Sequence, residues 1–254
     1  MTALSRAMWW SELHREVRET VATNAPAAGT VQIPDVSPGE VFAERRASEL
    51  LRDNGIPVVP SELVHNAADA VAAAERLGYP VVVKLSSDAV AHKSDIGGVR
   101  LNLADAASVQ AAFEDVVRAG REAGASDAAA LVQPQRAGGI ELLVGAIRDP
   151  QWGVALAVGL GGVWVEVLKD TALHVLPVDH RRIVEGLEQL RGAALLTGAR
   201  NTEATDLGAI SEVILKIADL VAGLGDRLES LEINPLLVRG SRVEALDALI
   251  TWRA

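Results

Sequence analysis

A strand, a polar loop and a second strand follow one another between Gly78 and Leu103, and this stretch constrains the fold more than any other. It reads GYPVVVKLSSDAVAHKSDIGGVRLNL, and the apolar and β-branched residues around Lys84 predict a buried strand. The loop contains paired glycines, which allow the backbone to turn N–H groups toward an anion, and a lysine that supplies full charge. The loop residues of this expected phosphate-type site are His92, Lys93, Ser94, Asp95, Gly97 and Gly98.

A less specific interpretation of the same stretch is a β-hairpin whose lysines are solvated. Lysine side chains often extend from an apolar strand to water, so Lys84 alone favours this simpler interpretation. The grouping of a histidine, a lysine and two polar residues beside paired glycines favours a functional loop instead. We therefore expect a nucleotide site with a cation at each end of one loop.

Composition excludes several classes of protein. The chain has 254 residues, nearly half of them hydrophobic, which suits one large domain or two smaller lobes. Its net charge of −10 provides no basic surface for nucleic acid, and the absence of cysteine excludes disulfides, thiolate catalysis and zinc–thiolate sites. No stretch is long and apolar enough to span a bilayer, so we expect no membrane association and a cytoplasmic location.

The pattern changes after the first 39 residues. Residues 9–23 have the spacing of a short amphipathic helix, and prolines and glycines interrupt any regular element in residues 24–39. We interpret residues 1–39 as an N-terminal extension and linker. Residues 40–254 then form one domain, with lobes at roughly 40–134 and 135–254.

Helical and strand patterns alternate in the first lobe, and strands dominate in the second. This order predicts an α/β protein built from two α+β lobes rather than from one parallel sheet. The expected helices are residues 41–53, 67–77 after an Asn66 cap, 106–123, 180–190 and 206–224. Besides the two strands already described, the expected strands are 128–133, 139–147, 154–160, 163–168, 172–178 and two that close the chain.

The closing strands, residues 231–239 and 242–249, flank a Gly-Ser pair suited to a two-residue hairpin turn. In such a hairpin, Asn234 lies directly across from Asp247, and Glu232 lies two residues away on the same face. Three oxygen-bearing side chains without nitrogen or sulfur ligands suit Mg²⁺ or Mn²⁺ better than zinc. An outward polar face on an edge hairpin explains the same pattern equally well.

Two further segments are informative. Residues 133–141 join a buried strand to the second lobe, so their exposed backbone is either a hinge that pairs with a base edge or a plain interdomain turn. Residues 159–162 are glycine-rich but lack the spacing and the following helix of a dinucleotide fingerprint. We give little weight to dinucleotide binding.

Four ordered motifs carry a resemblance to a known family: the stretch at 78–103, LVQPQRAGGIELLVGAIRDPQWG, GLGGVWVEVLKDTALHVLP and LEINPLLV. From about Glu40 to the C-terminus, the chain resembles the ATP-grasp subunit or domain of the NDP-forming acyl-CoA synthetases. These include ADP-forming acetate–CoA ligases and are relatives of succinyl-CoA synthetase. The resemblance implies an ATP-grasp fold, whose two lobes clamp a nucleotide. It also implies interconversion of a carboxylate, CoA and ATP with acyl-CoA, ADP and phosphate.

The resemblance assigns a role to each matching residue. It implies that His92 carries the phosphoryl group transiently and that Lys93 is the second catalytic residue. It implies a divalent metal at Glu232, Asn234 and Asp247, in agreement with the hairpin geometry. The residues it implies for ATP or ADP binding are Lys84, Ser94, Asp95, Gly97, Gly98, Gln133 and Gln135 at the base, and Glu141 at the ribose.

The family's CoA-binding domain and its other phosphohistidine region have no counterpart in this sequence. The resemblance therefore implies half of an enzyme, completed in a hetero-oligomer by a CoA-binding α-type subunit and acting on a small carboxylate. Two other functions remain open: a regulatory nucleotide-binding module without catalysis, and a stand-alone ATP-grasp ligase that joins a carboxylate to an amine. Retention of Lys84, His92, Asn234 and Asp247 argues against the first, and the second needs no carrier histidine.

Overall fold

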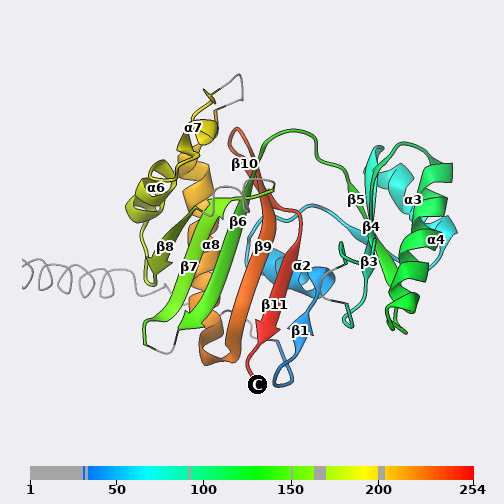
Figure 1. Cartoon of the computed structure of the whole chain (residues 1–254), viewed down its shortest axis with the longest axis horizontal. Coiled ribbons are helices and arrows are strands. Elements are labelled where there is room, and N and C mark those ends of the chain that lie inside the picture. Colours follow the sequence, from blue (N-terminus) through cyan, green and yellow to red (C-terminus); the bar gives the residue numbers. More distant parts are fainter. Residues whose placement is uncertain (1–30, 32–33, 91–92, 150, 163–169, 200–203) are drawn as a thin grey trace, which may run out of the picture.

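The computed structural model describes residues 31, 34–90, 93–149, 151–162, 170–199 and 204–254. Within this part of the chain, the strands form two antiparallel sheets that belong to separate lobes (Figure 1). The helix expected at 9–23 and the strand expected at 163–168 lie outside the described residues. The expected α/β class with two α+β lobes is confirmed.

The smaller lobe has a four-stranded sheet in the order β2-β5-β3-β4, and helices α3 and α4 pack on one face of it (Figure 1). Its core joins Val81, Val83 and Leu85 of β3 to Val109 and Val116 of α4. The elements are β2 (Glu62–Val64), α3 (Ala67–Leu77), β3 (Val81–Ser86), β4 (Val99–Leu103), α4 (Ala106–Glu122) and β5 (Ala129–Pro134).

Helix α3 begins and ends where the sequence predicts. The Asn66 side chain accepts a hydrogen bond of 2.9 Å from the backbone N–H of Asp69, which satisfies one of the free donors at the helix start. Gly78 follows the last helical residue with φ of 84°, a conformation that favours glycine. Local capping chemistry was therefore sufficient to place this helix.

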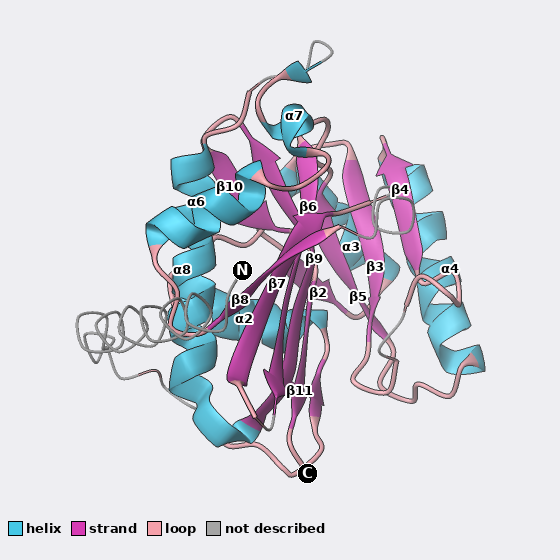
Figure 2. Cartoon of the chain, turned by 60° about the vertical axis from the view of Figure 1, so that its left-hand side comes forward, coloured by secondary structure: helices cyan, strands magenta, loops and turns pink. Residues whose placement is uncertain are grey.

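The larger lobe has a seven-stranded sheet among the described residues, with the path β1-β11-β9-β6-β7-β8 and with β10 paired to β9. Helices α6 and α8 lie on one face of this sheet (Figure 2). Its elements are β1 (Val41–Phe42), α2 (Glu44–Asp53), β6 (Ile140–Asp149), β7 (Gly153–Leu160), β8 (Thr171–Val175), α6 (His180–Glu188), α7 (Ala193–Leu196), α8 (Leu207–Leu224), the short 3₁₀ helix η2 (Gly225–Arg227), β9 (Leu228–Arg239), β10 (Arg242–Ala245) and β11 (Ala248–Trp252).

Strand β1 and helix α2 belong to the larger lobe, although the sequence analysis placed both in the first lobe. Val41 pairs with Thr251 of β11, and the Phe42 ring packs edge-on against Trp252 with ring centroids 5.2 Å apart. The helix predicted from residue 41 therefore begins at Glu44, because long-range strand pairing takes residues 41 and 42 and Ala43 becomes the N-cap. As a result α2 lies at the boundary between the lobes (Figure 1).

The closing hairpin has the predicted register. Arg239 pairs with Arg242 across the Gly240–Ser241 turn, and the same register continues to the Ile233–Ala248 pair. The prediction of one continuous second strand is wrong, because pairing is interrupted at Leu246 and Asp247 and leaves separate strands β10 and β11. This interruption lies opposite Asn234 and Pro235, where the site described below is built.

The described helices include none that is both long and apolar enough to cross a bilayer.

Candidate functional site

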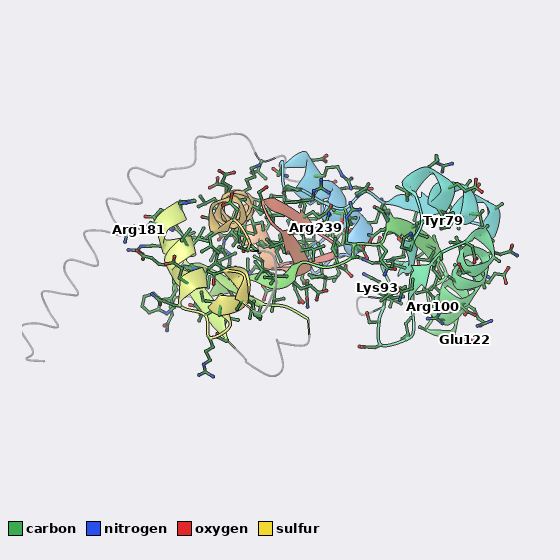
Figure 3. The ribbon with its side chains drawn as sticks, turned by 90° about the horizontal axis from the view of Figure 1, so that it is seen from above. Tyr79, Lys93, Arg100, Glu122, Arg181 and Arg239 are labelled. Carbon is green, nitrogen blue, oxygen red and sulfur yellow. The ribbon has the colours of Figure 1, made fainter. Side chains whose placement is uncertain are left out.

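A pocket of about 180 Å³ lies where the end of β3 and the loop after it approach α2, β9 and β11. It brings together Lys93, Ser94 and Asp95 of the predicted phosphate loop and all three predicted metal ligands. Figure 3 shows Lys93 on the side of the smaller lobe that faces the larger one. The lining residues are Ala43, Glu44, Arg45, Leu85, Ser86, Ser87, Val90, Lys93, Ser94, Asp95, Glu232, Asn234, Asp247, Ala248 and Leu249.

Lys84 is buried behind the pocket lining, against Glu44, and is not the solvated strand lysine of the simpler interpretation. Its side chain is 8% exposed, and its Nζ donates hydrogen bonds of 2.8 Å to Glu44 Oε1 and to the backbone oxygen of Leu246. The Leu246 oxygen lies in the interruption between β10 and β11. The break in the strand thus supplies a partner for a buried cation, as burial of a charge requires.

Lys93 enters the same cluster from the loop. Its Nζ lies 2.6 Å from Glu44 Oε2, and it is 2.7 and 2.9 Å from the two carboxylate oxygens of Asp247. Burial alone would lower the pKa of Lys93, but Glu44 and Asp247 together raise it above its usual range. The loop therefore delivers a permanent positive charge into the pocket.

Glu44 lies between the two lysines, although nothing in the sequence singled it out. It is the first residue of α2, it is 4% exposed, and its two carboxylate oxygens each contact one of the two lysines. Burial would raise the pKa of Glu44, but Lys84 and Lys93 hold it below the ordinary value. The sequence showed only that Glu44 lies in the first turn of a helix after a linker. Many exposed acids occupy that position, because they interact favourably with the helix dipole, so the position does not indicate a site.

The predicted metal ligands lie in the expected arrangement at this pocket. The backbone N–H of Asn234 donates to the backbone oxygen of Asp247 at 3.1 Å. The Asn234 side chain donates to Glu232 Oε1 at 3.3 Å. Burial and the nearby Glu44 raise the pKa of Asp247 more than the two lysines lower it. No group of three or more acidic, histidine or cysteine side chains suited to a metal occurs among the described residues. An ion at this place would rely on one or two carboxylates, an amide oxygen and ligands from outside the protein, which is the usual habit of Mg²⁺.

The N–H groups of Gly97 and Gly98 do not make the contacts predicted for them, which were with an anion. The N–H of Gly97 donates to Ser94 at 3.1 Å and that of Gly98 to Lys93 at 2.7 Å, so both groups close the loop on itself rather than point toward an anion. The oxygen of Gly98 accepts from Leu85 at 2.7 Å, which ties the loop to β3. These bonds fix the backbone of Lys93, so the glycines support the pocket indirectly.

Substitution of Gly98 by alanine is expected to destabilise the protein by about 1–3 kcal/mol through overpacking. A Cβ at this position would lie 2.8 Å from the Lys93 backbone oxygen, closer than such atoms approach one another, and in a tight contact of 3.1 Å with the Leu85 Cβ. The free energy of unfolding in urea measures the effect. Gly145→Ala is the matched control, because nothing lies within 4 Å of its added Cβ. Equal stability of the two variants would contradict the loop geometry described here.

The predicted base and ribose residues lie outside the pocket lining. The Gln133 side chain is buried and donates to Glu44, so it belongs to the lysine cluster. The Gln135 side chain instead exchanges hydrogen bonds with Asn102 at the edge of the smaller sheet. Glu141 is exposed, and its backbone oxygen accepts from Gly161 at 2.6 Å beside the glycine-rich turn. His92 lies outside the described residues.

The buried carboxylate of Glu44 predicts a specific dependence of stability on pH. Its folded pKa is below the ordinary value of 4.5, so its contribution is complete above that pH and is lost as pH falls through the folded pKa. We expect Glu44→Gln to lower the free energy of unfolding by about 3 kcal/mol at pH 7, and by progressively less below the ordinary value. Denaturant titrations between neutral and acid pH measure this difference. Glu49→Gln, at an exposed acid on the same helix, is the control, and a loss at Glu44 that does not change with pH would contradict the assignment.

Comparison with known proteins identifies the fold. A family model described as ATP-grasp domain matches residues 37–251, which include both lobes and the pocket between them. The chain belongs to the ATP-grasp domain family.

Its curated relatives are CoA ligases of two lengths. A trans-feruloyl-CoA synthase from an unknown prokaryotic organism is 40% identical over 215 residues, which cover 83% of this chain and 30% of that protein. The β subunit of ADP-forming acetate–CoA ligase I from Pyrococcus furiosus is 33% identical over 209 residues, which cover 82% of this chain and 90% of that subunit. The chain thus spans about a third of the first relative and nearly all of the second.

Solved structures agree with this assignment. An acetyl-coenzyme A synthetase from Ca. Korarchaeum cryptofilum, in complex with coenzyme A and Ca-AMPCP, is 28% identical with a TM-score of 0.79, over 94% of this chain and 99% of that one. A further structure of the same synthetase contains Mg-AMPPCP, with a phosphohistidine segment pointing towards the nucleotide binding site. It is 27% identical, with a TM-score of 0.71, over 94% of this chain and 99% of that chain. The expected ATP-grasp fold is therefore confirmed.

Proposed function

We propose that this chain is the ATP-binding subunit of an ADP-forming acyl-CoA synthetase, which converts a carboxylate, CoA and ATP to acyl-CoA, ADP and phosphate. The observation that carries the proposal is the convergence of Lys93, Asn234 and Asp247 at one pocket between the lobes, with the Lys84 Nζ buried behind the lining at 3.8 Å from Asp247. Phosphoryl transfer requires positioning and charge neutralisation more than covalent help from the protein. Two fixed ammonium groups beside oxygen ligands meet that requirement.

In this proposal the nucleotide phosphates lie at the pocket and the base lies toward the segment after β5. Lys93, Ser94 and Asp95 of the pocket lining surround the phosphates together with Lys84 behind the lining, and Gly97 and Gly98 hold the loop in place. Because the Gln133 and Gln135 side chains have protein partners, the backbone of that segment is the part that pairs with the base edge. Glu141, exposed on β6, binds the ribose.

A divalent ion, Mg²⁺ or Mn²⁺, fits the oxygen donors at the hairpin. Glu232, Asn234 and Asp247 would hold it together with phosphate oxygens and water, which suits an ion that keeps part of its hydration shell. When bound, it would neutralise charge on the transferring phosphate.

We propose His92 as the carrier of the phosphoryl group. A neutral imidazole nitrogen forms a bond to the γ-phosphorus while the bond to the bridging oxygen breaks and its electron pair leaves with ADP. The phosphorylated imidazole keeps a high transfer potential and passes the group on to the carboxylate. The sequence motif around His92 supports this role.

The partner in this proposal is a CoA-binding α-type subunit in a hetero-oligomer, located in the cytoplasm, where ATP and CoA are available. The Pyrococcus furiosus relatives are described as β subunits, and the relatives of which this chain covers 30% have room for further domains in one polypeptide. CoA and the small carboxylate would then be bound mainly by the partner.

The test is reconstitution of this chain with its candidate CoA-binding partner in the presence of ATP, Mg²⁺, CoA and, in turn, acetate, 4-hydroxybutyrate or ferulate. Acyl-CoA and ADP should appear in equal amounts and only when both polypeptides are present. ATP binding without turnover in any combination would favour a regulatory module. An amide product formed by this chain alone would favour a carboxylate–amine ligase.

A further inference from the structure

We propose that Glu44 is a positioning residue that aligns Lys84 and Lys93 for the nucleotide phosphates. The inference rests on the proposed function and assigns a task to a residue that does not belong to the phosphate loop, the hinge or the metal hairpin. Glu44 belongs to the larger lobe, because α2 packs against β11, whereas both lysines belong to the smaller lobe. One carboxylate thus holds two cations across the boundary between the lobes.

The geometry is specific. Oε1 lies 2.8 Å from the Lys84 Nζ and Oε2 lies 2.6 Å from the Lys93 Nζ, so each oxygen serves one ammonium group. Gln133 donates to Oε1 as well, which fixes the rotation of the carboxylate from a third element, β5. With the side chain 3% exposed, water does not compete for these bonds. The contacts with Lys84 and Gln133 are charge-assisted hydrogen bonds, and the contact with Lys93 is a close ion pair.

A simpler role for Glu44 is stabilisation of the start of α2. An acid in the first turn interacts favourably with the helix dipole, and Ala43 before it provides no side-chain cap. That role does not require burial or contacts with another lobe, since an exposed acid at the helix start would serve equally well. The direction of both oxygens toward lysines of the smaller lobe indicates a task at the pocket.

The cluster is close to electrically neutral before any nucleotide arrives. Glu44 and Asp247 balance Lys84 and Lys93, and the Asp247 carboxylate also lies 3.8 Å from the Lys84 Nζ. Without Glu44, the two ammonium groups would repel each other and would compete for Asp247. Asp247 is one of the predicted metal ligands, so without Glu44 the two lysines would occupy a carboxylate that the metal ion requires. Glu44 therefore holds the two cations in place and leaves Asp247 free to bind the ion.

A positioning role for Glu44 predicts that Glu44→Gln changes the affinity for Mg-ATP in the direction opposite to the one expected from charge alone. Removal of a negative charge beside a polyphosphate site should strengthen binding on electrostatic grounds alone. If Glu44 positions the lysines, Glu44→Gln instead weakens binding of Mg-ATP by about 10- to 100-fold, the range expected for misplaced binding groups. Binding of adenosine, which has no phosphate, should be unchanged. A purely structural role would weaken the binding of both ligands alike.

The experiment is calorimetric titration of the purified full chain with Mg-ATP and with adenosine. The variants are Glu44→Gln, Glu44→Asp and the control Glu49→Gln, which changes an exposed acid on the same helix. The proposal predicts a selective loss of ATP affinity in Glu44→Gln, partial recovery in Glu44→Asp and wild-type values in Glu49→Gln. Tighter or unchanged ATP binding by Glu44→Gln would overturn the positioning role, as would equal losses for ATP and adenosine.

A double substitution, measured beside both single variants, tests whether Glu44 acts through Lys93. If Glu44 acts through Lys93, then adding Glu44→Gln to Lys93→Met should weaken ATP binding much less than Glu44→Gln does alone. Full additivity of the two losses would overturn the proposal. Failure of the wild-type chain to bind Mg-ATP at all is a separate result, and it would reject the proposed function.

Discussion

Substitution of Lys84 by methionine is expected to reduce phosphoryl transfer from ATP by about 10²- to 10³-fold, as the loss of a preorganised charge at a transferring group does in other enzymes. Methionine has a similar length and fits a buried position, so the change removes the charge and leaves little cavity. Lys84 is 8% exposed, and hydrogen bonds to Glu44 and to the Leu246 oxygen fix its ammonium group.

The measurement for this variant is the initial rate of ADP formation by the reconstituted enzyme at saturating ATP. The matched control is Lys216→Met, because Lys216 is exposed on α8 and contacts only the Gly55 oxygen among the bonds described, at 3.2 Å. The control should retain the wild-type rate. A Lys84→Met enzyme that is folded and still works at the wild-type rate would show that the pocket is not where the phosphate is transferred.

Substitution of Trp252 by alanine is expected to lower the free energy of unfolding by roughly 3–5 kcal/mol, the usual cost of removing a large aromatic residue from a core. Trp252 is 1% exposed and packs edge-on against Phe42, and its backbone N–H donates to the Glu40 oxygen at 2.9 Å. These contacts attach β1 to β11 and thereby hold the start of α2, where Glu44 lies.

Urea unfolding measures this loss, and the chain contains its own control. Trp152, in the turn between β6 and β7, is 60% exposed, so Trp152→Ala should change stability by less than about 0.5 kcal/mol. Similar losses for the two variants would contradict the packing of β1 against β11. Weaker ATP binding by Trp252→Ala is an additional expected result, because a loosened α2 no longer fixes Glu44.

The sequence was sufficient to predict those parts of the structure that local interactions determine. The Asn66 cap and Gly78 set the ends of α3, and the two-residue turn at Gly240 set the register of the closing hairpin. Because residues opposite each other in a hairpin share a face, the meeting of Asn234 and Asp247 also followed from the turn. The sequence also singled out Lys84 and Lys93, which the structure brings to one buried cluster.

The sequence was insufficient where distant segments meet. Glu44 lies 40 residues before Lys84, and nothing in its neighbourhood indicates that it will be buried between two lysines. Residues 41–42 have helical spacing but pair with a strand more than 200 residues away, which no local pattern reports. The Gln135 side chain faces Asn102 rather than the pocket, because its direction depends on the edge of the smaller sheet. Burial and side-chain direction are properties of the assembled lobes.

The most direct test of the account is incubation of the chain with ATP labelled at the γ-phosphate and Mg²⁺, with and without the CoA-binding partner. The account predicts acid-labile, base-stable label on this chain that depends on the partner and is absent from His92→Ala and from Lys84→Met. Wild-type protein that binds ATP but acquires no label under any condition would contradict it.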